Sequence, residues 1–240
     1  MHKASLRRVK VWSAPLRLSH WLMAGAGLVL LATGWLLHAD LALGGAPADF
    51  HYVAGYVLVA ALALRLYLLV LGSGAASWRD CLPPPGQWRA ALQTLRCYVS
   101  FGRFPLPAWY AHNPLWGPVY LAMFAVLALQ AATGLAFDEP YRLAGVTLVR
   151  VHVAGAVVIG VFTALHVAAV FVHDLSGSGS DTSAMINGHR IFVLPAPGDL
   201  PPPGIAGTGA SEAAGVQVVR PGDIARPPPE PKPPNGPPAA

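Results

Sequence analysis

Four histidines in or beside apolar segments are the residues of this sequence best suited to binding a cofactor. His20 and His51 each open an apolar segment, whereas His152 and His166 both lie in the last one. Ionisable side chains within membrane-spanning segments are costly and usually have a specific partner. Two neutral imidazoles on one iron give a six-coordinate b-type haem, which suits electron transfer because no coordination position is open.

The 14-residue spacing of His152 and His166 predicts that both side chains leave similar faces of one helix. Such a helix rises about 21 Å between them and returns to within about 40° of the starting direction. One imidazole then lies near each membrane surface, and His20 and His51 match these two depths. We therefore predict two haem b groups, with His20 and His166 ligating the inner iron and His51 and His152 the outer one.

The apolar segments that carry these histidines predict four transmembrane helices. They cover about 19–37, 52–71, 115–136 and 151–172, each close to the roughly 20 residues that cross a bilayer. Only 11% of the 240 residues are charged and 54% are hydrophobic, which favours lipid over water as the solvent. The predicted fold class is all-α, an integral membrane four-helix bundle with a short amphipathic cytoplasmic helix near 87–100. Residues 1–190 would form the dihaem domain, and 191–240 a Pro/Gly-rich disordered cytoplasmic tail.

Basic residues predict the orientation of this bundle. Lys and Arg precede the first segment and recur in the connection 72–114, whereas the connection 38–50 has neither. The positive-inside rule then places the N- and C-termini of this multi-pass protein in the cytoplasm. Cys81 and Cys97 would lie in this reducing compartment as free thiols.

Three further polar residues are candidates for contacts around the cofactors. Arg65 lies in the inner half of the second segment, where its guanidinium could bind a haem propionate or equally extend to the inner surface. Arg17 could bind a propionate at the same surface. His112 is open to three roles, as a propionate contact, in the lining of a quinone site, or as a helix cap. The remaining histidines are expected to be solvated, namely His2, His38, His173 and His189.

Other classes of protein remain open at this point. A transporter or proton-relay protein would also use intramembrane histidines, and inverted repeats would favour it. The segments Ala32-Thr33-Gly34 and Ala132-Thr133-Gly134 are too short to establish a repeat, although their glycines suit close approach of a macrocycle or a helix. A structural anchor for a partner enzyme is the third class. Nucleic acid is not an expected partner because no long Lys/Arg run occurs.

Several motifs together resemble the bacterial cytochrome b561 and nickel-iron hydrogenase b-type cytochrome family. They are VWSAPLRLSHW at 11–21, HYVAGY at 51–56 with Arg65-Leu66, HNPL at 112–115, QAATG at 130–134, the segment 152–166, and AMINGHR at 184–190. The resemblance covers about residues 9–190 and implies a four-helix bundle with two haems. It also implies His20, His51, His152 and His166 as the ligands.

The resemblance further implies an electron-transfer subunit of a respiratory oxidoreductase in the bacterial inner membrane rather than a stand-alone enzyme. Members of the family carry electrons between the quinone pool and a hydrogenase, another periplasmic oxidoreductase or a c-type cytochrome. Membrane lipid, quinone and such a redox protein are therefore the expected partners, and a homodimer is left open. The chain departs from the family in its Pro-rich tail and at Ser13, where the family often has Asp.

Overall fold

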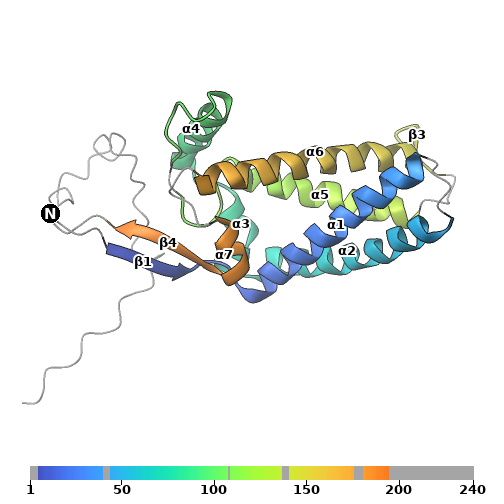
Figure 1. Cartoon of the computed structure of the whole chain (residues 1–240), viewed down its shortest axis with the longest axis horizontal. Helices are drawn as coiled ribbons and strands as arrows, with labels where there is room; N and C mark the ends of the chain where they lie inside the picture. Colours follow the sequence, from blue (N-terminus) through green and yellow to red (C-terminus); the bar gives the residue numbers. More distant parts are fainter. Residues whose placement is uncertain (1–4, 40–43, 108, 137–140, 176–180, 195–240) are drawn as a thin grey trace, which may run out of the picture.

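Four long helices dominate the computed structural model, which describes residues 5–39, 44–107, 109–136, 141–175 and 181–194 (Figure 1). They are α1 (Ala14–His38), α2 (Ala46–Leu71), α5 (Trp116–Leu135) and α6 (Leu148–Leu175). Each is long and apolar enough to cross a membrane, which confirms the predicted all-α membrane bundle. The prediction of a disordered tail over 191–240 was wrong for residues 191–194, which belong to a strand, β4 (His189–Leu194), and the rest of the tail lies outside the described residues.

The helices form because lipid leaves the backbone no other hydrogen-bond partners and because helix-starting residues occupy their first turns. In hydrocarbon every N–H and C=O must be satisfied within the segment. Proline stands in the first turn of α1 and α2, where its missing N–H costs nothing. α1 begins at Ala14, five residues before the predicted start at 19. The prediction followed hydropathy and so excluded the first turn, which contains Arg17 and lies outside the apolar part of the helix.

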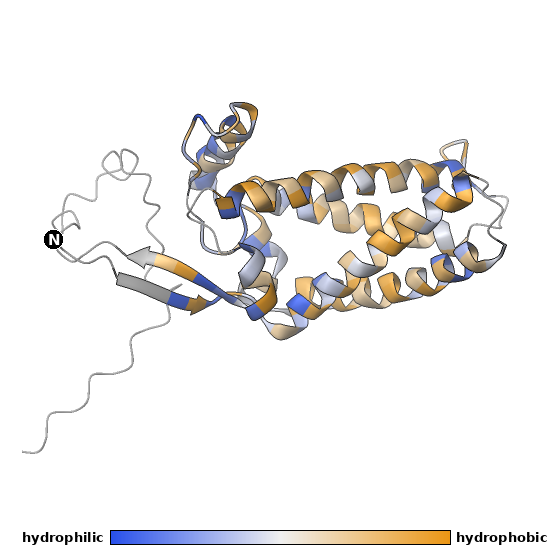
Figure 2. Ribbon diagram, viewed as in Figure 1, coloured by the Kyte–Doolittle hydropathy of each residue, from blue (hydrophilic) through white to orange (hydrophobic). Residues whose placement is uncertain are grey.

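The four long helices consist mostly of hydrophobic residues, as their colour in Figure 2 shows, and many of these side chains are exposed on the outside of the bundle. Val70 is 68% exposed and Val157 is 63% exposed in the isolated chain. Such exposure is unfavourable in water and is expected for side chains that contact lipid. α1 packs along α2, α2 meets α5, and α5 packs along α6. Among the described residues, α6 makes few close backbone contacts with α1 or α2.

One end of the bundle carries most of the remaining elements, and we call it the sheet end. Strands β1 (Ser5–Lys10) and β4 (His189–Leu194) pair there in antiparallel register, with Lys10 opposite His189. α3 (Trp78–Cys81), α4 (Trp88–Val99) and α7 (Asp181–Asn187) also lie at this end, with short 3-10 turns at Gly74–Ala76 and Pro85–Gln87 (Figure 1). A small core formed by Trp12, Leu16, Ala76, Ala111 and Ala184 packs the start of α1, the first 3-10 turn and α7 together at this end.

The opposite end, which we call the hairpin end, is simpler. Strands β2 (Arg142–Leu143) and β3 (Val146–Thr147) form a tight hairpin before α6. Its two turn residues, Ala144 and Gly145, both have positive φ, as a two-residue hairpin turn requires. None of the four strands was expected from the sequence, whereas the amphipathic helix near 87–100 is present as α4. Cys81 and Cys97 are free, as predicted.

Candidate functional site

The structure brings the four histidines together in the two pairs expected from their depths. The ring centroids of His20 and His166 are 6.4 Å apart, and those of His51 and His152 are 6.3 Å apart. The first pair joins α1 to α6 near the sheet end, and the second joins α2 to α6 near the hairpin end. The paired helices are those whose backbones make few close contacts, so the imidazoles meet where α6 stands apart from its neighbours.

The separation within each pair fits an iron ion held between two imidazoles. A ring nitrogen lies about 2 Å from a bound metal, and the ring centroid about 1 Å further, so two axial rings have centroids about 6 Å apart. Within the described residues, no group of three or more His, Cys, Asp or Glu side chains could hold a bare metal ion. Two imidazoles alone match the axial positions of a haem, whose porphyrin supplies the remaining ligands.

Threonine hydroxyls hold both histidines of the hairpin-end pair. Thr33 Oγ1 on α1 lies 2.8 Å from Nδ1 of His51, and Thr133 Oγ1 on α5 lies 3.0 Å from Nδ1 of His152. The threonines belong to the two Ala-Thr-Gly segments, in which only the glycines had seemed informative. Their role depends on which residue of the neighbouring helix lies next to each hydroxyl, and the sequence of one helix does not show which residue that is.

The glycines of these segments permit the close approach of the rings. A Cβ atom added at Gly34 would lie 3.4 Å from Cε1 of His51, and one at Gly134 only 3.0 Å from Cε1 of His152. Gln130, one turn before Gly134, donates to the backbone carbonyl of His152 at 2.9 Å and so ties α5 to the start of α6. The glycine predictions are thus supported at these two positions by contacts with the histidine rings themselves.

Aromatic rings rather than hydroxyls surround the sheet-end pair. His166 stacks on Phe162 with 5.6 Å between centroids, and its ring also contacts the rings of Trp116 and Tyr120. The Nδ1 atom of His20 is buried and has no hydrogen-bond partner among the described residues. The two pairs therefore differ in how their rings are held.

Two arginines and His112 lie at the sheet end, as expected, although their contacts there are with protein groups. Arg65 is buried and donates to the carbonyl oxygen of Ala76 at 2.9 Å. Arg17 donates to the carbonyl oxygen of Ile186, and its Nε atom has no partner among the described residues. Both guanidinium groups thus lie at the sheet end, where propionates are expected.

His112 is committed to a partner on α3. Its Nδ1 atom lies 2.8 Å from Oδ2 of Asp80, and its ring packs edge-on against Trp12 at 5.1 Å. Burial alone would lower the pKa of His112, but hydrogen bonds with Asp80 and Cys81 outweigh it and raise the pKa to about 9. The side chain is therefore a charged link between α3 and the segment that leads into α5.

The expectation that His173 is solvated was wrong. This side chain is buried, its Nε2 atom lies 2.5 Å from the hydroxyl of Tyr98, and its Nδ1 atom lies 3.3 Å from Asp181. Arg190 completes the network with a 2.9 Å ion pair to Asp181. Burial raises the pKa of Tyr98 to about 12, so its hydroxyl stays neutral. His173 is buried because α4 and α7 fold over the end of α6.

The other three histidines that were expected to be solvated lie at or near an end of the chain, of a helix or of a strand. His38 is exposed, His189 is partly exposed, and His2 lies outside the described residues.

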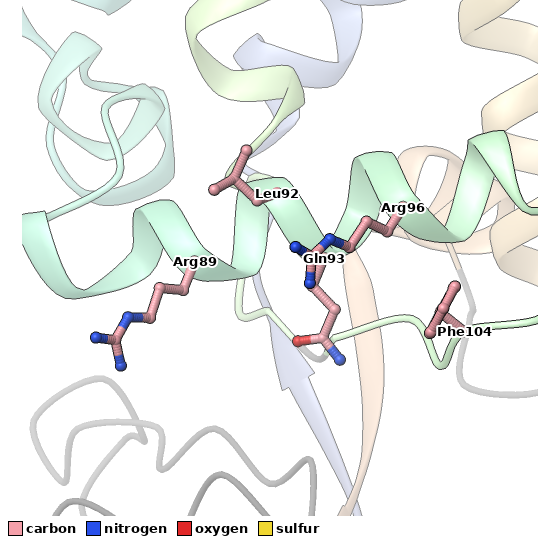
Figure 3. A pocket seen from close by; sticks show the side chains of 5 residues that line it. All are labelled: Arg89, Leu92, Gln93, Arg96 and Phe104. Atoms are coloured by element: carbon pink, nitrogen blue, oxygen red, sulfur yellow. The ribbon is translucent and has the colours of Figure 1, made fainter.

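A pocket of about 370 Å³ lies on α4 and the segment after it, away from both histidine pairs. Figure 3 shows Arg89, Leu92, Gln93 and Arg96 projecting from α4 and Phe104 from the following segment. The mixture of guanidinium groups and apolar side chains is typical of a helix at a membrane surface. None of the four paired histidines lines this pocket, so it is not the cofactor site.

Comparisons with known proteins identify relatives of this chain. The chain is 28% identical over 223 residues to the "Probable Ni/Fe-hydrogenase B-type cytochrome subunit" of Cupriavidus necator, covering 78% of this chain and 89% of that protein. It is 29% identical over 226 residues to the protein of the same name from Rhodobacter capsulatus, covering 78% and 84% respectively. The Escherichia coli K12 "Probable Ni/Fe-hydrogenase 1 B-type cytochrome subunit" is 24% identical over 211 residues, covering 75% and 89%.

No solved structure matches the chain significantly. The family described as "Prokaryotic cytochrome b561" matches residues 11–188, which include all four long helices and both histidine pairs. The match covers well over half of the sequence. The chain therefore belongs to the prokaryotic cytochrome b561 family, as a membrane b-type cytochrome of electron transport.

Proposed function

We propose that this chain holds two haem b groups, one at each end of the bundle, and carries electrons between the quinone pool and a redox partner protein. The observation that supports it is the pairing of His20 with His166 and of His51 with His152 at 6.4 and 6.3 Å. Haem supplies a reversible one-electron couple when it is bound. The protein supplies the ligands, the orientation and the apolar surroundings.

The histidines of α6 set the distance over which electrons would move. His152 and His166 are 14 residues apart, so their backbones lie about 21 Å apart along the helix. The bilayer core is about 30 Å thick, so one pair lies near each surface. A haem held between the two imidazoles of either pair would have no ligand position left for oxygen or substrate, which suits electron transfer.

The charged residues of the sheet end support a cytoplasmic location for it. Arg79, Arg89, Arg96 and Arg103 all lie in the connection between α2 and α5, on the same side as Arg17. The positive-inside rule then assigns the hairpin end to the outer face of the inner membrane. Arg17 and Arg65 would bind propionates of the sheet-end haem, because both guanidinium groups lie at the same end of the bundle as His20 and His166.

The partner proteins are proposed from the relatives. Those relatives are named as subunits of Ni/Fe-hydrogenases, so a hydrogenase at the hairpin end is the leading candidate for the redox partner. Quinone is the lipid-soluble partner expected from the family resemblance. His112 remains a candidate for the lining of its site, although Asp80 already occupies the Nδ1 atom of this ring.

The test is the haem content of single histidine variants of the full chain, purified from membranes. The unaltered chain should hold two haem b per polypeptide, and His166→Ala should retain about one, because only the sheet-end pair is broken. His38→Ala is the matched control, since His38 is exposed at the end of α1 and should leave both haems in place. A colourless unaltered chain, or loss of both haems or of neither in His166→Ala, would contradict the proposal.

A further inference from the structure

We propose that Thr33 and Thr133 are positioning residues that fix the tautomer of the hairpin-end histidines and lower the reduction potential of the iron they bind. The inference rests on the proposed ligation by His51 and His152. Each threonine stands on a different helix from the histidine that it contacts, Thr33 on α1 facing α2 and Thr133 on α5 facing α6. The two contacts are independent, and the same three-residue motif supplies both.

The single proton of each hydroxyl is already committed to the backbone. Thr33 Oγ1 lies 2.7 Å from the carbonyl oxygen of Val29, and Thr133 Oγ1 lies 2.9 Å from that of Leu129. A carbonyl oxygen can only accept a hydrogen bond, so each hydroxyl donates its proton to its own helix. The oxygen can then only accept from the imidazole.

It follows that Nδ1 carries the proton in both His51 and His152. A neutral imidazole has one N–H and one free lone pair, so the lone pair must be on Nε2. This is the nitrogen that a metal ion between the two rings would need. The glycine after each threonine has a matching effect, because its Cβ-free backbone admits the Cε1 edge of the ring. At Gly134 an added Cβ would lie 3.0 Å from Cε1 of His152 but 3.9 Å from Nε2.

In the sheet-end pair, one of the two histidines has no hydrogen bond of this kind to any described residue. Nδ1 of His20 is buried without a hydrogen-bond partner among the described residues. An imidazole that donates its second N–H is a more basic ligand than one that does not. More basic axial ligands stabilise ferric iron over ferrous iron and so lower the potential. The threonine contacts therefore make a contribution that lowers the potential of the hairpin-end iron and that His20 does not receive from the described residues at the sheet end.

The test is a potentiometric titration of the haem-loaded full chain carrying Thr33→Val and Thr133→Val together. Valine keeps the branched shape and removes the hydroxyl. His166→Ala, which should retain only the hairpin-end haem, assigns the two redox transitions. We expect the ratio of reduced to oxidised hairpin-end haem at fixed ambient potential to rise about threefold, or about 30 mV for a one-electron couple. The sheet-end transition should not move.

Two further variants separate the hydroxyl from other effects. Thr33→Ser with Thr133→Ser keeps both hydroxyls and should restore the original potential. Thr163→Val is the matched control, because Thr163 on α6 makes the same bond to a backbone carbonyl, at 2.8 Å from Ile159, with no histidine described at its hydroxyl. It should leave both transitions unchanged.

The outcomes distinguish this inference from the proposed function. Two haems per chain in the valine variant with an unchanged hairpin-end potential would overturn the role of the threonines and leave the dihaem assignment intact. Loss of the hairpin-end haem in the valine variant, but not in the serine variant, would support that role, whereas equal loss in both would contradict it. An unaltered chain without haem at His51 and His152 would remove the proposed function itself.

Discussion

The ion pair between His112 and Asp80 makes the stability of the sheet end depend on pH. The pKa of His112 is about 9 in the folded chain, against 6.5 for an unperturbed histidine. A pKa raised by folding stabilises the folded state fully below pH 6.5, and this contribution disappears as the pH rises through 9. The difference corresponds to about 3 kcal/mol at about 1.4 kcal/mol for each pH unit. Asp80 is 36% exposed, so solvent screening reduces this figure to about 2 kcal/mol.

The assay is thermal unfolding of the detergent-solubilised chain between pH 6 and pH 10. A loss of about 2 kcal/mol should lower the midpoint by about 4 to 8 °C for a chain of this size. Asp80→Asn supplies the control, because it removes the charge that favours protonation of His112 and should flatten this part of the pH profile. Other groups near His112, such as Cys81 and Tyr120, are present both in the unaltered chain and in Asp80→Asn, so they cannot cause a difference between the two pH profiles. Equal loss of stability with pH in both chains would show that the ion pair is not responsible.

Two substitutions test other contacts of the bundle. Tyr98→Phe removes the hydroxyl that pairs with His173 and with the indole N–H of Trp116. We expect it to lower the free energy of unfolding by about 2 to 4 kcal/mol and to speed amide exchange in α4. Tyr67→Phe is the control, because Tyr67 is exposed. Gly134→Ala places a methyl group 3.0 Å from His152 and should lower haem content at the hairpin end, whereas Gly25→Ala, with nothing within 4 Å, should not. An unaltered haem spectrum in Gly134→Ala would show that the ring has room to move.

The four helices and the histidine pairs were predictable because their signals are local. A run of apolar residues identifies a span without knowledge of its neighbours, and the 14-residue spacing in α6 depends only on helix geometry. Pairing by depth then follows from the order of the spans. The helix ends were less predictable, since hydropathy marks the part of α1 in hydrocarbon and not the turn containing Arg17.

Features that depend on contacts between distant segments were missed. β1 and β4 are separated by almost the whole described sequence, and a six-residue strand has too short a sequence pattern to be predicted by itself. The burial of His173 depends on Tyr98 from α4 and Asp181 from α7. Thr33 was visible in a repeated motif, but its contact with His51 depends on the rotation of α1 against α2. In each case the deciding information lies in another element.

The pairing of β1 with β4 also has a consequence for the order of assembly. β1 leaves the ribosome before any helix is made, yet its partner strand is synthesised only after α7. The amide groups of Val11 and Trp12 likewise wait for the carbonyl of Gly188, which they contact at 2.8 and 3.1 Å. All four membrane-spanning helices are therefore synthesised before β1 can pair with β4. The N-terminal strand of a nascent chain thus stays unpaired until β4 has been synthesised.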